Sequence, residues 1–406
     1  MAALARCVGD VERFLAEHWS RAPVLCRGAD PHGFADLFSL DDVDAVIASS
    51  LPRVPEFRLV RDGEPLDPAA YTTTMQIGGR SVSGVGDPGR IFDEFAAGAT
   101  IVLQTLHRWW APLARFCRAL ELELQHPVQT NAYVTPAGSR GLAVHHDTHD
   151  VFVLQLAGHK HWDVYEPAVE LPLPTQRWSK DRHQPGEHVL SAELGPGDVL
   201  YLPRGFAHSA ASGDEVSAHL TVGVLVQTWA DVARDLVRSV ADDVEFRQTL
   251  PVGFASDPGF PAAVAAFVER LQKHVANVDA AALAEATTRR FWSSRPPILA
   301  GQLAQLALAE RLSDRSVVRR RPEACCHLSL ESGDDAGVER LVVALGDREL
   351  RMPAVLEAAV RRLSSGAAIE VADLAGELDA DSRLVLVRRL VREGLLEVLD
   401  PPPTGL

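Results

Sequence analysis

The stretch that decides the fold is residues 129–165, QTNAYVTPAGSRGLAVHHDTHDVFVLQLAGHKHWDVY. Short runs of β-branched and aromatic residues alternate in it with glycine, proline and aspartate turns, a pattern typical of a barrel or sandwich of short strands. The two-residue period of a strand places His145 and Asp147 on one face and His146 on the other. An imidazole beside a carboxylate supplies two of the three ligands of a 2-His-1-carboxylate metal site.

The third ligand is predicted in a second stretch, residues 195–208, GPGDVLYLPRGFAH. A Gly-Asp turn, an apolar strand and a Pro-Arg-Gly turn precede His208, so this histidine is expected at the start of the next strand. This order looks like the second signature of the cupin double-stranded β-helix, in which the terminal histidine is the last metal ligand. Together the two stretches therefore predict one metal site formed by His145, Asp147 and His208. Such a site leaves coordination positions open on iron(II).

These motifs resemble those of the JmjC-type Fe(II)/2-oxoglutarate-dependent oxygenases, and among them the ribosomal oxygenases, which are protein hydroxylases. The similar segments also include FLAEHWSRAPVL at 14–25 and DVEFRQTLP at 243–251, so the resemblance covers essentially the whole chain. It implies an α+β fold, in which a cupin-type double-stranded β-helix (JmjC) barrel is followed by a helical dimerisation region and a C-terminal winged-helix domain.

By motif position, the resemblance also assigns a co-substrate pocket. Lys160 is expected to pair with the distal carboxylate of 2-oxoglutarate, since a dicarboxylate inside a barrel needs a cation. Asn131 and Tyr133 share one face of a preceding strand and are expected to line this pocket, and Thr221 is expected to add a hydroxyl. The remaining histidines of the two stretches are expected to point away from the metal or to sit at the rim.

Sequence patterns divide the chain into three parts. Residues 1–227 are expected to form the JmjC catalytic domain with an N-terminal extension, and residues 90–124 within it show helical periodicity. Residues 228–318 are helical and carry more apolar surface than one chain needs to bury, which predicts a dimerisation domain. Residues 319–406 combine short helices with a final extended run and resemble a winged helix. The polar stretch 166–190 is predicted to be a lid or a substrate loop.

Charge and composition indicate the partners and the location. A net charge of −15 disfavours nucleic acid, and residues 320–406 are themselves acidic, so no direct DNA binding is expected. A protein or peptide substrate is expected, with a basic ribosomal protein as the candidate, and a homodimer as the assembly. Five scattered cysteines, an N-terminus unlike a signal peptide and the lack of an 18-residue apolar run predict a cytoplasmic protein that does not attach to membranes.

The expected function is that of a dioxygenase that hydroxylates a C–H bond of a protein side chain. His145, Asp147 and His208 would be the catalytic metal ligands, Fe(II) the metal and 2-oxoglutarate the co-substrate, with succinate and CO2 as co-products. Two alternatives stay open. One is a peptide or small-molecule hydroxylase, such as a natural-product tailoring enzyme, with the same site. The other is a non-enzymatic cupin-like binding protein.

Overall fold

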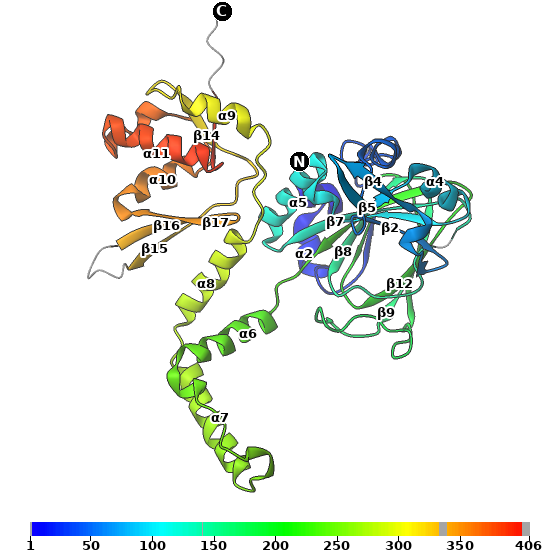
Figure 1. The fold of residues 1–406 in the computed structure, drawn as a ribbon, viewed down its shortest axis with the longest axis horizontal. Helices are drawn as coiled ribbons and strands as arrows, with labels where there is room; N and C mark the ends of the chain where they lie inside the picture. Colours follow the sequence, from blue (N-terminus) through cyan, green and yellow to red (C-terminus); the bar gives the residue numbers. More distant parts are fainter. Residues whose placement is uncertain (1, 140, 333–338, 400–406) are drawn as a thin grey trace, which may run out of the picture. The chain divides into compact units, whose positions relative to one another are not determined.

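The computed structural model describes residues 2–139, 141–332 and 339–399. The chain forms two compact units, Met1–Val226 and Gln227–Leu406, which are described in turn (Figure 1). No helix among the described residues is long and apolar enough to cross a membrane.

The first unit is built on an eight-stranded antiparallel sheet. Its strand order is β1-β11-β8-β13-β7-β6-β2-β3. Strands from residues 129–165 and 195–208 lie side by side in this sheet, where β8 pairs with β11 on one side and with β13 on the other. The strands are β1 (Val24–Cys26), β2 (Phe57–Arg61), β3 (Glu64–Pro65), β6 (Thr100–Leu103), β7 (Val128–Thr135), β8 (Asp150–Ala157), β11 (Val199–Leu202) and β13 (Ser217–Val224).

A smaller sheet faces the large one and closes the barrel. It has the order β10-β9-β12, with β9 (Lys160–Pro167), β10 (His188–Leu194) and β12 (Phe206–Ser212). Val151 and Val153 of β8 pack toward it, in a cluster with Trp162 and Leu194, whereas Phe152 and Leu154 pack into the core on the other face. The continuous apolar run of β8 therefore reflects a strand that is buried on both faces.

Helices cover the outer face of the large sheet. They are α1 (Ala3–Val8), α2 (Val11–Glu17), α3 (Leu40–Ala45), α4 (Pro88–Ala96) and α5 (Ala111–Leu124). Leu113 and Leu120 of α5 are fully buried in the core that also holds Ala132 of β7. Between the two helices expected within residues 90–124, the run Thr100–Leu103 forms strand β6 rather than helix. Its four buried residues are too few for a helix, and pairing with β2 and β7 satisfies their backbone.

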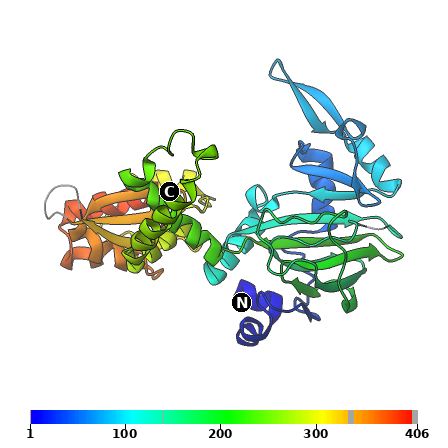
Figure 2. The ribbon, with the colours of Figure 1, turned by 90° about the horizontal axis from the view of Figure 1, so that it is seen from below.

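A two-stranded hairpin projects from this unit, as Figure 2 shows in light blue. It is formed by β4 (Thr72–Ile77) and β5 (Arg80–Gly86), which pair only with each other among the named strands. Gly78 and Gly79 both have positive φ, at 57° and 78°, as a two-residue hairpin turn requires.

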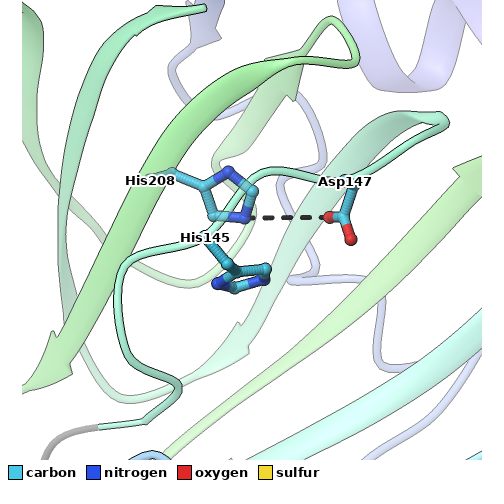
Figure 3. Close-up of side chains that lie close together, drawn as sticks. All are labelled: His145, Asp147 and His208. Atoms are coloured by element: carbon cyan, nitrogen blue, oxygen red, sulfur yellow. Dashed lines mark ion pairs between the residues drawn. The ribbon is translucent and has the colours of Figure 1, made fainter. Parts of the chain in front are cut away.

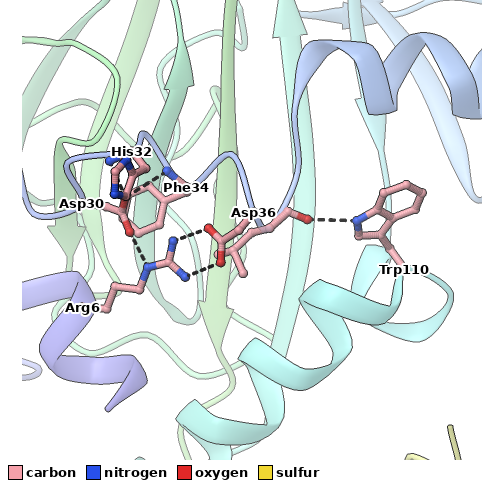
Figure 4. Close-up of polar contacts among 7 residues, drawn as sticks. Arg6, Asp30, His32, Phe34, Asp36 and Trp110 are labelled. Carbon is pink, nitrogen blue, oxygen red and sulfur yellow. Dashed lines mark hydrogen bonds and ion pairs between the residues drawn. The ribbon is translucent and has the colours of Figure 1, made fainter. Parts of the chain in front are cut away.

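An arginine clip fixes α1 to the segment that leads into α3 (Figure 4). The Arg6 guanidinium bonds Asp30 through Nε and donates to both carboxylate oxygens of Asp36, and it lies 5.0 Å from the centre of the Phe34 ring. The amide of Asp30 donates to the carbonyl of Gly197 at 3.1 Å. The clip therefore holds the N-terminal helix near the turn that precedes β11.

Replacing Arg6 with alanine is expected to lower the free energy of opening of α1 by roughly 2 kcal/mol, because the buried Asp30 carboxylate loses its cation. Native-state hydrogen exchange of the α1 amides measures this change. Arg13→Ala is the control, since it breaks an exposed pair with Glu17 and should leave the exchange rates unchanged. Equal effects of the two substitutions would contradict the role of the clip.

The second unit begins with helices that leave their apolar side chains uncovered. Neither α6 (Trp229–Ser239) nor α7 (Phe260–Ala276) contains a buried residue, and Phe291 is the one buried residue of α8 (Ala280–Ser293). A helix is usually stabilised by packing an apolar face, so α6 and α7 have surface available for a partner.

The rest of the second unit shares one core. It contains two three-stranded sheets, β18-β14-β19 and β15-β16-β17. Its core begins with Ala309 and Leu312, upstream of the predicted domain boundary at residue 319. Helix α9 belongs to this part because the Gln305 side chain accepts from the Val398 amide at 2.6 Å. The elements are α9 (Gln302–Ala309), α10 (Glu357–Leu363), α11 (Ala380–Arg392), β14 (Val317–Arg320), β15 (His327–Ser332), β16 (Glu339–Leu345), β17 (Arg348–Pro353), β18 (Ile369–Glu370) and β19 (Leu396–Val398).

Candidate metal centre

The side chains of the three predicted ligands lie close together, as Figure 3 shows. One ligand atom from each of His145, Asp147 and His208 lies within 4.8 Å of the other two. The Oδ2 atom of Asp147 lies 3.7 Å from the Nε2 atom of His208. Among the described residues, no other group of histidine, cysteine, aspartate or glutamate side chains has this spacing.

Backbone pairing brings the two ligand-bearing segments into register. His145 and His208 form an isolated antiparallel bridge, in which each amide donates to the carbonyl of the other at 3.1 and 2.8 Å. Residues 145–149 form no regular strand, but this bridge keeps the alternation of side chains that a strand would give. His145 and Asp147 therefore share one side, and His146 points to the other.

Both imidazoles are held in the tautomer that a metal ion needs. The Nδ1 of His145 donates to the carbonyl of Ala143 at 2.8 Å, and the Nδ1 of His208 donates to that of Phe206 at 3.0 Å. A carbonyl only accepts, so each Nε2 carries the free lone pair. Backbone carbonyls orient the histidine ligands of metal sites in the same way.

The protonation states also suit a metal. Burial, together with the neighbouring His145, lowers the pKa of His208 to about 4. Burial opposes ionisation of Asp147, yet the adjacent imidazoles, His149 foremost, hold the pKa of this carboxyl below its usual value. The site therefore offers a neutral imidazole and a carboxylate at neutral pH, and this donor set fits Fe(II).

A cavity extends from the three ligands into the barrel. Lys160 lines it and is 2% exposed, and its Nζ donates to the Thr135 hydroxyl at 2.8 Å. Burial lowers the pKa of this ammonium to about 7. Within the described part of the chain, no carboxylate lies at ion-pair distance from Lys160. A buried cation without a protein anion favours an anionic ligand.

Two of the other predicted pocket residues line the same cavity. Tyr133 of β7 and Thr221 of β13 contribute side chains to its wall. Burial, reinforced by the charge of Asp147, raises the pKa of Tyr133, so its hydroxyl keeps its proton at neutral pH. Asn131 shares the strand face of Tyr133 but does not line the cavity, and its Oδ1 accepts from the Thr105 amide at 2.9 Å. Its contribution to the co-substrate pocket stays a prediction.

Sequence patterns did not identify polar residues in the wall of this cavity, such as Thr100 and His219, or Thr135 next to it. Thr135 bonds Lys160, and its hydroxyl lies 3.2 Å from that of Thr100. His219 stacks on Tyr133 with ring centres 5.1 Å apart, and burial lowers its pKa well below the usual value. The alternation that placed Asn131 and Tyr133 on one face continues to Thr135, so this residue could have been found from the sequence.

His146 holds the polar loop, predicted as a lid or substrate loop over residues 166–190, next to the three predicted ligands. Residues 168–187 contain no helix or strand. The Nε2 of His146 donates to the carbonyl of Gln176 at 3.1 Å, and its ring meets the ring of Trp178 edge-on, with centres 5.4 Å apart. His183 packs against both rings at the same distance. His146 therefore anchors the loop and points away from the three predicted ligands.

The other histidines of these stretches have contacts of their own. His149 lies against Gly223 of β13, where any Cβ atom would come within 2.6 Å of its ring. His159 pairs with Glu215, and His161 pairs with Asp163, in half-exposed positions on the smaller sheet. None of these three belongs to the group of side chains whose ligand atoms lie within 4.8 Å of one another, and their exclusion as ligands stays a prediction.

Replacing Trp178 with alanine is expected to release residues 173–183 from the barrel. The two ring contacts that disappear are each worth about 0.5–1.5 kcal/mol, so trypsin should cleave after Arg177, Lys180 or Arg182 roughly tenfold faster or more. Timed proteolysis with mass spectrometry measures the rate. Trp229→Ala removes an exposed indole and should not accelerate these cuts. Trypsin cleavage of the loop at the wild-type rate in Trp178→Ala would contradict the role of this ring in holding the loop.

Comparison with known proteins agrees with this geometry. Residues 106–232 match the family model of the JmjC domain. Ribosomal oxygenase 1 of Gallus gallus is 32% identical over 317 residues, which are 73% of this chain and 51% of that protein. Bifunctional lysine-specific demethylase and histidyl-hydroxylase NO66 of Dictyostelium discoideum is 27% identical over 250 residues, which are 59% of this chain and 47% of that protein. The chain spans about half the length of the curated relatives it matches.

The fold is also that of solved structures. The structure of E. coli ycfD aligns with a TM-score of 0.54 at 18% identity, over 96% of this chain and 98% of that one. A structure of YcfD described as a ribosomal oxygenase in complex with cobalt and 2-oxoglutarate aligns with a TM-score of 0.50 at 17% identity, over the same shares of the two chains. The chain therefore carries a JmjC domain with a cupin-type fold and is a homologue of the ribosomal oxygenases.

Proposed function

We propose that the protein is a Fe(II)- and 2-oxoglutarate-dependent oxygenase that hydroxylates a C–H bond of a protein side chain. The observation that carries this proposal is the shared cavity, which joins a metal-ligand triad to the buried ammonium of Lys160. A cupin-like protein without this chemistry would have no need to keep an unpaired cation inside its barrel. The ribosomal oxygenase and histidyl-hydroxylase relatives support a protein substrate.

The residues of the cavity have distinct roles in this proposal. His145, Asp147 and His208 would hold the metal from one side and leave the cavity side open. Lys160, oriented by Thr135, would bind the distal carboxylate of 2-oxoglutarate. Bound iron(II) supplies the activation of O2 that converts 2-oxoglutarate to succinate and CO2 and inserts oxygen into the substrate.

The apolar wall of the cavity excludes water from this chemistry. Val151, Val153 and Trp162 line the cavity and are at most 5% exposed. A dry wall strengthens the attraction between Lys160 and a carboxylate and limits side reactions.

Anaerobic titration of 2-oxoglutarate into the Fe(II)-loaded protein tests the proposal. The expected result is a weak visible metal-to-ligand charge-transfer band that saturates at one equivalent. A non-enzymatic binding protein would give no such band. Mass spectrometry of a proteome with and without the active protein then looks for the gain of one oxygen atom. Oxygen found only on peptides or small molecules would favour the tailoring-enzyme alternative.

The proposed substrate is a basic protein of the ribosome, and the proposed location is the cytoplasm. The net charge of −15 supports a basic partner. The arginines of α11 support the expectation that the second unit does not read DNA, because three of them pair with carboxylates of the same chain. These pairs are Arg383 with Asp314, Arg392 with Glu310 and Arg389 with Glu393.

The proposed assembly is a homodimer formed through α6 and α7, as predicted for residues 228–318. Val264, Phe267, Val268 and Val275 of α7 are each 40–42% exposed, and Trp229 of α6 is 87% exposed. Sedimentation of the full chain is expected to give a dimer, and Phe267→Asp a monomer. Val355→Asp places the same charge at an exposed valine of the C-terminal part and should remain dimeric.

A further inference from the structure

A buried ion pair lies beside the metal ligands but outside the cavity lining. Asp150 is fully buried and Arg204 is 9% exposed. The Oδ1 of Asp150 accepts from the backbone amide of Arg204 at 3.2 Å and from its Nη1 at 3.1 Å. Asp150 follows Asp147 by three residues and Arg204 precedes His208 by four. The pair therefore joins the two segments that carry the ligands.

The turn around Arg204 is fixed from both sides. The amide of Gly205 donates to the carbonyl of Asp147 at 3.0 Å. Gly205 has a φ of 92°, and a Cβ atom there would lie 2.2 Å from the carbonyl oxygen of Val169. Only glycine fits this position, because the turn packs directly against the carbonyl of Val169. A shift of Arg204 would be passed on to the backbone that holds Asp147.

The N-terminal extension completes the network. The Oδ2 of Asp150 accepts from the Tyr201 hydroxyl at 2.6 Å and from the Ser20 hydroxyl at 2.9 Å. The Ser20 amide donates to the Tyr201 hydroxyl at 2.8 Å, and Arg204 Nη1 donates to the Ser20 hydroxyl at 3.2 Å. Ser20 lies outside the matched JmjC segment, residues 106–232, and has a φ of 53°. Its unusual backbone conformation directs both its amide and its hydroxyl into the network.

We infer that Asp150 and Arg204, completed by Tyr201 and Ser20, form a positioning site that sets the spacing of the metal ligands. The physical reason is that a buried charge stays in place only while its hydrogen bonds are satisfied, and a metal site tolerates displacements of only about 0.5 Å. The N-terminal extension thus acts on the metal centre through the hydroxyl of Ser20. This inference rests on the proposed function, because it requires that the triad binds metal.

Cobalt(II) titration of the full-length metal-free protein tests the inference. The affinity and the visible absorption spectrum of bound Co(II) are the readouts, and a merely stabilising pair would change neither. Asp150→Asn and Arg204→Gln are expected to weaken Co(II) binding roughly tenfold, the lower end of the effect of losing a partner of a metal ligand, because the pair acts on the ligands through the backbone. Ser20→Ala and Tyr201→Phe each remove one hydrogen bond to Asp150 and should weaken Co(II) binding by a smaller factor.

Arg118→Gln is the matched control. It breaks another buried ion pair, with Glu121 of α5, whose side chains are 5% and 9% exposed. Glu121 also accepts from the amide of Val128 in β7, a strand that carries none of the three predicted ligands, so the substitution is expected to lower stability and to leave Co(II) affinity unchanged. Each variant is titrated at a temperature at which circular dichroism shows it to be folded.

The outcomes separate the inference from the proposed function. A wild-type Co(II) affinity and spectrum in Asp150→Asn, or an equal loss in Arg118→Gln, would overturn the inference and leave the proposed function intact. If Asp150→Asn does not fold, Ser20→Ala and Tyr201→Phe decide in its place, and wild-type binding in both would overturn it. A wild-type protein that binds no Co(II) would overturn the metal site and the inference together.

Discussion

Replacement of Asp147 with alanine is expected to abolish substrate-dependent succinate formation. Asp147 is the one anionic member of the triad, and two imidazoles alone hold a divalent metal weakly. The loss should exceed the roughly 10- to 100-fold effect of removing an outer partner of a metal ligand. Succinate is measured by mass spectrometry with Fe(II), 2-oxoglutarate and O2 present, and the metal content of the variant is determined in parallel.

Asp163→Ala is the control for this experiment. Asp163 lies on the smaller sheet and bonds His161, His188 and Ser191 rather than the cavity residues. The substitution makes the same chemical change outside the cavity and should leave turnover at the wild-type rate. Unchanged turnover in a metal-verified Asp147→Ala protein would rule out the triad assignment.

The affinity for 2-oxoglutarate is expected to fall as the pH rises above about 7. Burial lowers the pKa of Lys160 to about 7, so the ammonium is already charged below this pH. Above it, the cavity must take up a proton before it can pair with a carboxylate, which reduces the affinity about tenfold per pH unit until the pKa of the bound state is reached. Titration of the anaerobic Fe(II) protein through the charge-transfer band measures the slope.

Lys160→Arg removes the titration and keeps the charge. A guanidinium remains protonated throughout this range, so the affinity of the variant should not depend on pH above 7. Lys160→Met removes the charge and should weaken 2-oxoglutarate binding at every pH. A wild-type affinity that is constant between about pH 6 and 9, together with an unchanged affinity in Lys160→Met, would show that Lys160 does not bind the carboxylate.

Short-range patterns in the sequence were enough to identify the residues that meet at the site. The period-two alternation separates His145 and Asp147 from His146, and in the structure a single bridge to His208 preserves it. The strand-like runs around them form β8, β9, β11 and β13. These features are local, because alternation and turn residues follow from the backbone of a few neighbouring positions.

Other features depended on partners far along the chain. The run Thr100–Leu103 became a strand because β2 and β7 flank it, and α9 joined the C-terminal core because Gln305 bonds β19. The cavity wall includes Thr100 and His219, which come from separate strands. No local pattern could report these pairings.

The sequence by itself predicted His145, Asp147 and His208 as metal ligands from two short motifs, and its resemblance to the JmjC oxygenases implied the cupin-type barrel and the role of Lys160. Only the tertiary structure decided what surrounds them. In the folded chain, His146 bonds the loop at Gln176. Asp150 is buried beside Arg204 and also accepts a hydrogen bond from the Ser20 hydroxyl. The physical reason is that burial and long-range hydrogen bonds are properties of the packed chain. A charged residue in a sequence shows its chemistry but not the partner that makes its burial possible.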